Sequence, residues 1–136
     1  MRNLILIPIL VFAFLFCLST KAKDWTEITK GQNGHIFFVD MESLVESKGY
    51  IYFWQLINYN DQDEYGDMSA KIYVKAECEV FKFQWLKVSY HKMLMGKDYV
   101  KPNNPSKLVA GWQLPSIGST SYAVLDYVCK NKGLLL

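Results

Sequence analysis

Apolar residues recur at every second position through most of the chain, a pattern that predicts β-strands. The clearest alternation runs over residues 68–78. Its apolar positions share one face, and they are Ile72, Val74, Ala76 and Cys78. Its polar and aromatic positions share the other face, and they are Lys71, Tyr73, Lys75 and Glu77. A strand with one buried face is typical of a sheet that is covered on that side.

Further strands are indicated on both sides of this one. Residues 25–30 and 35–40 flank the turn signal at 31–34 (GQNG) and predict a hairpin. Residues 50–59 are apolar on both faces, as expected for a central strand. Between these strands, residues 41–48 predict a short helical turn or loop that ends at Gly49, and residues 60–67 an acidic loop.

The alternation changes phase after residue 85. Phe83 and Trp85 give way to Leu86, Val88 and Tyr90, and a shift of one residue inside a strand predicts a β-bulge. Residues 93–96 are expected to extend this hairpin. The following stretch, 97–107, contains two prolines and two asparagines and is expected to be irregular.

The last segment has the period of a helix. Ser119, Thr120 and Ser121 are each suitable N-caps, and Gly133 is the expected end. One face then carries Tyr122, Leu125, Val128 and Cys129. The predicted fold class is therefore α+β, with a single antiparallel sheet and one C-terminal helix in one domain of a 136-residue chain.

The pattern of residues at the N-terminus predicts a targeting signal. A positive start, an apolar stretch from Leu4 to Leu18 and small residues at Thr20 and Ala22 predict a signal peptide over residues 1–22, cleaved near Ala22. An uncleaved anchor is the alternative, but about 15 apolar residues are fewer than a membrane span needs. Lipidation of Cys17 is disfavoured because Phe16 precedes it. The domain then occupies residues 23–136.

Two cysteines remain in the exported chain. An oxidising compartment favours a disulfide between Cys78 on the strand and Cys129 on the helix. Closing that loop is expected to stabilise the fold by about 4 kcal/mol in the chain-entropy model.

The charge of the chain argues against nucleic acid as a partner. The whole chain has 15 basic and 13 acidic residues, and removal of Arg2 and Lys21 with the signal peptide leaves it neutral. Every other basic residue is lysine, whereas nucleic-acid readers usually need arginine forks. No nucleic acid is expected as a partner.

Motifs for catalysis and cofactors are weak. The acidic loop at 61–67 resembles the start of a calcium loop, but Ile72 stands where the bidentate acid belongs. His35 and His91 lack the further ligands of a zinc site. No nucleophile motif occurs, and we expect neither enzymatic activity, nor a metal, nor a cofactor.

Aromatic residues are the remaining functional signal. They exceed what one helix is expected to bury, which indicates a partner surface on the sheet. Tyr73 is the best marker, with Lys71 and Lys75 beside it to attract an acidic partner. The competing interpretation is that tyrosine is a good strand former here.

Several residues together resemble a known family. They are Trp25, Phe38-Val39-Asp40, Gly49, Trp54, Asn58, Ser69, Glu77-Cys78, Gly96, Pro115-x-x-Gly118-Ser119 and Cys129. In this order they resemble the surface-adhesin protein E-like domain of Gram-negative bacteria, over nearly all of the exported chain.

The resemblance implies about six antiparallel strands with a disulfide-tethered C-terminal helix. It also implies the periplasm or outer-membrane surface, a protein partner and a homodimer as one allowed state. The first functional hypothesis is thus an exported, non-enzymatic binding or adhesion module. The alternatives are a periplasmic domain that binds a small apolar ligand or haem, and a structural envelope component.

Overall fold

The computed structural model describes residues 24–135. The predicted signal peptide and its cleavage site lie outside these residues. The strands are β1 (Thr26–Lys30), β2 (Ile36–Ser47), β3 (Tyr50–Asn58), β4 (Ser69–Glu77) and β5 (Lys82–His91). The helices are η1 (Leu94–Gly96), α1 (Thr120–Asn131) and η2 (Lys132–Leu135). Within residues 24–135, no helix is both long and apolar enough to cross a membrane.

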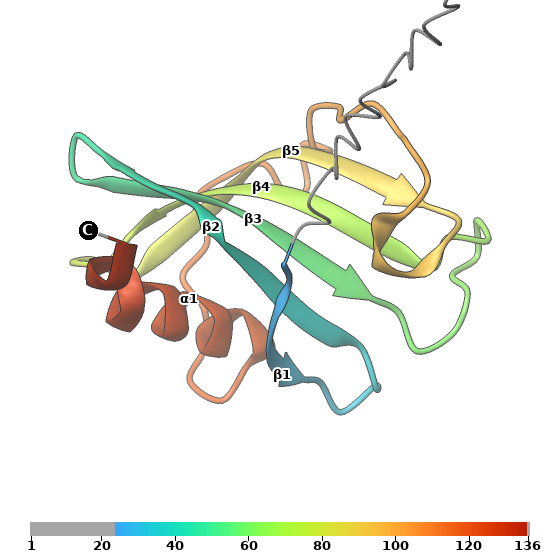
Figure 1. Ribbon diagram of the computed structural model, residues 1–136, viewed down its shortest axis with the longest axis horizontal. Helices are drawn as coiled ribbons and strands as arrows, with labels where there is room; N and C mark the ends of the chain where they lie inside the picture. The colour runs from blue at the N-terminus through green and yellow to red at the C-terminus, as the bar shows by residue number, and fades with distance from the viewer. Residues whose placement is uncertain (1–23, 136) are drawn as a thin grey trace, which may run out of the picture.

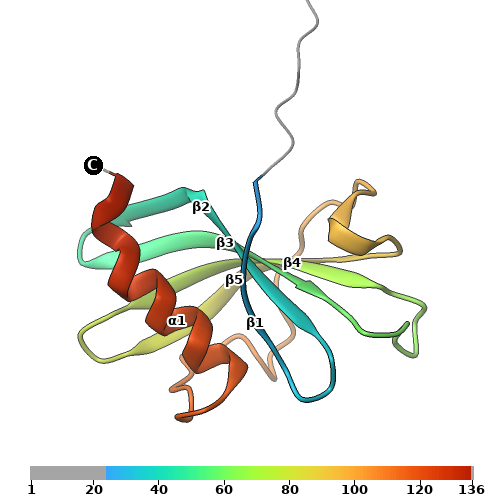
Figure 2. The ribbon, with the colours of Figure 1, turned by 60° about the horizontal axis from the view of Figure 1, so that its bottom comes forward.

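The strands form one sheet in the order β1-β2-β3-β4-β5, and every neighbouring pair is antiparallel. α1 lies across one face of this twisted sheet (Figures 1 and 2). We call the face under α1 the inner face and the opposite one the outer face. The predicted fold class, the first hairpin and the central position of residues 50–58 are confirmed.

The expected helical turn at 41–48 is wrong, because β2 continues to Ser47. The register between β2 and β3 shifts between Asp40 and Val45. At the shift the Ser43 hydroxyl donates to the Asp40 carbonyl (2.6 Å) and accepts from the Trp54 amide (2.9 Å). A side chain thus takes the place of a backbone group in the ladder, which the mixed polar pattern of this segment concealed.

The predicted bulge in β5 is confirmed. Tyr73 of β4 pairs with Lys87, but the next residue, Val74, pairs with Trp85, so Leu86 is the extra residue. The bulge returns the apolar positions on either side of it to the same face.

Residues 93–96 do not extend the hairpin, because the outer face binds their backbone. Asn58 Oδ1 accepts from the Met95 amide (2.8 Å). Ser69 Oγ accepts from the Gly96 amide (3.0 Å) and donates to the Met93 carbonyl (2.6 Å). Gly96 has a positive φ, and a Cβ at this position would collide with the side chain of Lys71. The segment therefore turns as η1 and covers one end of the outer face.

The described residues form five strands where the resemblance implied about six. Beyond β5 the chain returns along its free edge as a segment that we call the strap, residues 97–113. The strap makes isolated bridges from Asn103 to Val88 and from Gln113 to Phe83. Pro105 lies between the bridges and has no amide hydrogen to donate, so this segment cannot pair continuously.

Ser119 is the N-cap of α1, and its hydroxyl accepts from the Tyr122 amide (3.1 Å). The helix ends at Asn131, earlier than the expected end at Gly133. The predicted disulfide is present, and the Cα atoms of Cys78 and Cys129 are 5.7 Å apart. It attaches the end of α1 to the turn that follows β4.

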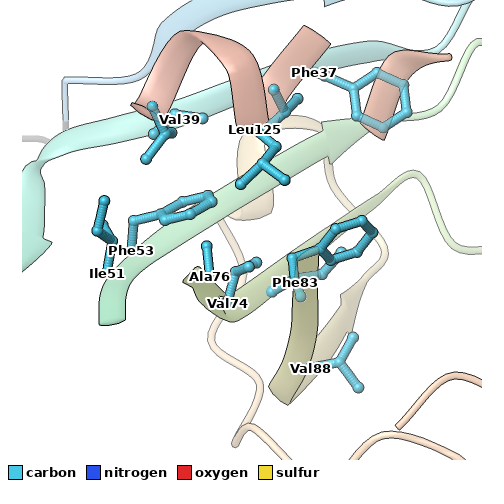
Figure 3. Close-up of a cluster of buried hydrophobic side chains, with 12 residues drawn as sticks. Phe37, Val39, Ile51, Phe53, Val74, Ala76, Phe83, Val88 and Leu125 are labelled. Carbon is cyan, nitrogen blue, oxygen red and sulfur yellow. The ribbon is translucent and has the colours of Figure 1, made fainter. Parts of the chain in front are cut away.

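The core lies between α1 and the inner face (Figure 3). Val124, Leu125 and Val128 are the buried residues of the helix. They pack on sheet residues that include Phe37, Val39, Ile51, Phe53, Ile72, Val74, Ala76, Phe83 and Val88. The inner set predicted for β4 is confirmed, because Ile72, Val74 and Ala76 are all fully buried.

Replacing both cysteines by serine should lower the free energy of unfolding by about 2–5 kcal/mol, because the open chain regains the entropy of the loop. Urea denaturation of the variant Cys78→Ser/Cys129→Ser against the oxidised wild type measures this loss. The reduced wild type is the control and should match the variant. An unchanged denaturation midpoint would contradict the role that we assign to the bond.

Candidate functional site

The outer face carries two contacting groups of aromatic rings, and Lys75 lies near a ring of each group. Trp54 and Tyr73 are directly paired on β3 and β4, and their ring centroids are 5.0 Å apart with an interplanar angle of 27°. The ring centroids of Tyr52 and Tyr73 are 6.2 Å apart. At the other end, Tyr50 stacks on Trp112 of the strap at 6.0 Å. We call Tyr50, Tyr52, Trp54, Tyr73 and Trp112 the aromatic row.

Two lysines border the aromatic row. Lys75 Nζ lies 4.0 Å from the ring centroid of Tyr50 and 5.8 Å from that of Trp112. Lys82 Nζ lies 4.4 Å from the same indole and 3.3 Å from a carboxylate oxygen of Glu77. These cation–π contacts hold the ammonium groups at the surface of the rings and attach the strap to the sheet.

The three residues predicted as a partner surface all lie on the outer face, but in different surroundings. Tyr73 is half-buried because it stacks on Trp54. Lys75 is part of the aromatic row's border. Lys71 lies at the far end, where its side chain passes over Gly96 of η1.

Sequence reasoning missed Trp112. It comes from the irregular strap, where no alternation shows which face a side chain occupies. With 38% of its surface exposed, it is the most exposed ring of the aromatic row. The contact with Tyr50 joins residues that are far apart in the sequence, and a local pattern carries no signal for such a contact.

One arrangement on the outer face resembles a hydrolase triad. Ser89 Oγ lies 2.7 Å from His91 Nε2, and His91 Nδ1 lies 3.4 Å from Asp98 Oδ1. Nδ1 also donates to the Asp98 carbonyl (2.7 Å). Ser89 and His91 are 3% and 1% exposed, which leaves no access for a substrate. The arrangement therefore attaches the chain after β5 to the sheet.

Asp98 is held by hydrogen bonds that also shift its pKa. Burial raises the pKa of Asp98, but hydrogen bonds from the amides of Lys92 and Met93 and the charge of His91 lower it more, so the net shift is downward. Its stabilising contribution is present above the ordinary value of 3.8 and is lost as the pH falls through the lowered pKa.

Hydrogen bonds and one ion pair hold the acidic loop. Asp63 Oδ1 accepts from the amides of Tyr65 (2.9 Å) and Asp67 (2.8 Å), and Asp67 pairs with Lys92 (2.8 Å). His35 Nδ1 accepts from the Asn60 amide (3.1 Å). Among residues 24–135, no three side chains of His, Cys, Asp or Glu are grouped so as to hold a metal ion.

Of four cavities within residues 24–135, three are lined by no member of the aromatic row and one includes Tyr50. The apolar one, between α1 and the inner face, has a volume of about 40 Å³ and is lined by Phe53 and Trp85, among others. Ligand pockets usually measure about 300–1,000 Å³. The hypothesis of an apolar-ligand or haem pocket under the helix therefore has no structural support.

The other three cavities are open and lined mainly by polar residues. One of about 630 Å³ lies between the turn at 31–33 and the start of α1. One of about 230 Å³ lies beside Cys78, between Glu46 and Lys132. The last, about 400 Å³, lies beside Tyr59 and the acidic loop.

A model of the family described as surface-adhesin protein E matches residues 25–130. This chain belongs to the surface-adhesin protein E family. The family supports the predicted class of function, a binding or adhesion module, and an extracellular or envelope location. No curated protein matches the chain.

Solved structures of protein E from Haemophilus influenzae share the fold. Crystal form II is 16% identical with a TM-score of 0.60, covering 82% of this chain and 94% of that one. Another structure of the same protein is 16% identical with a TM-score of 0.60, covering 83% and 92%. Protein E from non-typeable H. influenzae is 15% identical with a TM-score of 0.59, covering 83% and 80%. At such identities the likeness establishes the fold alone.

Tyr59 should make the surface-adhesin domain sensitive to alkali. Burial, followed by Tyr90, Asp63 and Asp67, raises the pKa of Tyr59 from 10.0 to about 12. The unfolded chain ionises first, so stability is full below pH 10 and declines as the pH rises towards 12. Titration of tyrosinate absorbance should show a late step that Tyr59→Phe removes. A step of ordinary pKa lost in that variant would contradict this assignment.

Proposed function

We propose that this chain is an exported, non-enzymatic adhesion module that binds a protein partner through the aromatic row. The observation that carries the proposal is the row itself, which joins two central strands to the strap on the face that α1 leaves uncovered. Tyrosine and tryptophan provide rigid contact area at a low cost in conformational entropy, and they are enriched among residues that dominate binding.

The lysines favour an acidic segment of the partner. Lys75 and Lys82 lie against the rings, and Lys87, which pairs with Tyr73 across the strands, is exposed. A carboxylate that contacts a ring edge would meet these ammonium groups at the same time. The lysines then determine the orientation and rate of association more than the affinity.

We also propose that residues 1–22 are a signal peptide that is removed near Ala22, and that residues 23–136 form the mature domain. The support is the order of positive start, apolar stretch and small residues. The proposed destination is the periplasm or outer-membrane surface of a Gram-negative bacterium. A homodimer through the aromatic row is the competing use of the same face.

Substitution in the aromatic row should weaken binding to a host surface. On a sensor coated with extracellular matrix, Tyr73→Ser and Trp112→Ser should each weaken binding of the purified protein by at least about tenfold. The matched control is Tyr65→Ser, because Tyr65 is 73% exposed and lies outside the row, so this variant should bind like the wild type.

Two measurements make this result interpretable. Tyr73→Ser should lose about 1 kcal/mol of stability, since one stacked pair contributes about 0.5–1.5 kcal/mol. It should still unfold cooperatively, which circular dichroism checks. If both row variants bind the matrix as the wild type does, the proposed face is wrong. If they instead abolish self-association measured by sedimentation, the row is a homodimer interface.

Export predicts a defined mass. Protein isolated from the envelope fraction should lack about the first 22 residues, because the signal peptidase recognises Thr20 and Ala22. Intact-mass spectrometry measures this directly. A mass that retains residues 1–22, or one that includes acyl chains on Cys17, would contradict the proposal.

A further inference from the structure

The near-neutral net charge conceals a separation of charge along the chain. Residues 24–79 contain eleven acids and four lysines, a net charge of −7. Residues 80–125 contain six lysines and a single acid, Asp98, a net charge of +5. The fold turns this separation along the sequence into a separation in space, because residues 82–113 are β5, η1 and the strap, with the short link between β5 and η1.

The basic segment lies along one edge of the sheet. Asn103 exchanges two backbone hydrogen bonds of 2.9 Å with Val88, and Gln113 exchanges bonds of 2.8 and 3.0 Å with Phe83. The strap therefore follows the free edge of β5 from one end of that strand to the other. Figure 2 shows this segment passing from η1 behind the sheet to the start of α1.

Intramolecular contacts engage only part of this charge. The Asp98 carboxylate accepts hydrogen bonds from the amides of Lys92 and Met93 and lies 3.4 Å from His91 Nδ1. Lys82 pairs with Glu77, and Lys92 pairs with Asp67. Three exposed lysines of the strap, namely Lys97, Lys101 and Lys107, make no ion pair within residues 24–135.

Large exposed side chains lie beside these lysines: Tyr99 between Lys97 and Lys101, and Leu108 directly after Lys107. Tyr99 is 90% exposed and Leu108 is 96% exposed. Pro102 and Pro105 restrict the intervening backbone, so these side chains are presented by a stiffened segment. Lysines close to an exposed Tyr and an exposed Leu match a membrane interface, where headgroups are anionic and the layer beneath is apolar.

We propose that the strap docks the protein on an anionic lipid surface, with Lys97, Lys101 and Lys107 against the headgroups and Tyr99 and Leu108 entering the interface. Two observations favour lipid over a specific anion. The four cavities described above are lined by other residues. All basic groups of the strap are lysines, which attract charge diffusely, whereas defined sulfates or phosphates are usually bound by arginine forks.

The orientation follows from the acidic edge. β1 is at the opposite edge of the sheet, where two acids, Asp24 and Glu27, and one lysine, Lys30, are exposed, so this edge is acidic on balance. An anionic surface repels that edge while it attracts the strap, so the two effects select the same orientation. Trp112 belongs to both the strap and the aromatic row, but Tyr73 lies outside the strap, so Tyr73→Ser should bind lipid normally and separates lipid docking from the proposed adhesion.

Vesicle sedimentation with the purified mature protein tests the proposal. Vesicles of equal parts phosphatidylglycerol and phosphatidylcholine should bind it, and pure phosphatidylcholine should not. Each lysine near an anionic surface contributes about fivefold in affinity, so Lys97→Gln/Lys101→Gln/Lys107→Gln should lose on the order of 100-fold. Binding should also weaken as salt rises from about 50 mM to about 500 mM.

The matched control removes the same charge elsewhere. Lys30→Gln/Lys48→Gln/Lys132→Gln changes three exposed lysines outside the strap and should bind like the wild type. Tyr99→Ser/Leu108→Ser should lose about tenfold, because the apolar contribution is removed. Tyr99→Trp should gain fluorescence that is quenched by phosphatidylglycerol with brominated acyl chains.

Several outcomes would overturn the proposal. They are no binding to the anionic vesicles, equal binding to neutral vesicles, or equal losses in the strap and control triple variants. Strap-dependent binding to heparin without binding to phosphatidylglycerol would show a polyanion site in place of a lipid-docking one.

Discussion

A single helix of twelve residues, about 18 Å long, covers one face of a five-stranded sheet, and the rest of the structure depends on how that helix is held. Ser119 caps its start, and the Cys78–Cys129 bond fixes its end. Val124, Leu125 and Val128 then fill the inner face. Because the helix covers only the inner face, the apolar surface of the outer face has to be shielded from water by other parts of the chain.

The outer face does so with its own side chains and with the returning chain. Tyr73 stacks on Trp54, Tyr50 stacks on Trp112, and Lys75 lies over the Tyr50 ring. Each ring therefore serves stability and presents contact area at the same time. This double role explains why Tyr73 is half-buried and still belongs to the surface that we propose for binding.

The residues through which the chain resembles its family mostly hold the fold. Ser69 binds the backbone of η1, Asn58 binds Met95, and Ser119 caps α1. Gly49, with a positive φ, closes the turn between β2 and β3. These roles are compatible with a shared fold at 16% identity. They also explain why the resemblance predicts architecture and identifies no binding partner.

The sequence by itself determined the fold class, the central strand, the bulge in β5 and the disulfide, because alternation and helical period depend only on neighbouring positions. It did not reveal that β2 continues past Asp40, where the hydroxyl of Ser43 replaces a ladder bond. Only the tertiary structure placed Trp112 on Tyr50 and the strap along β5. Such contacts join segments whose meeting depends on the whole topology, so no local pattern encodes them.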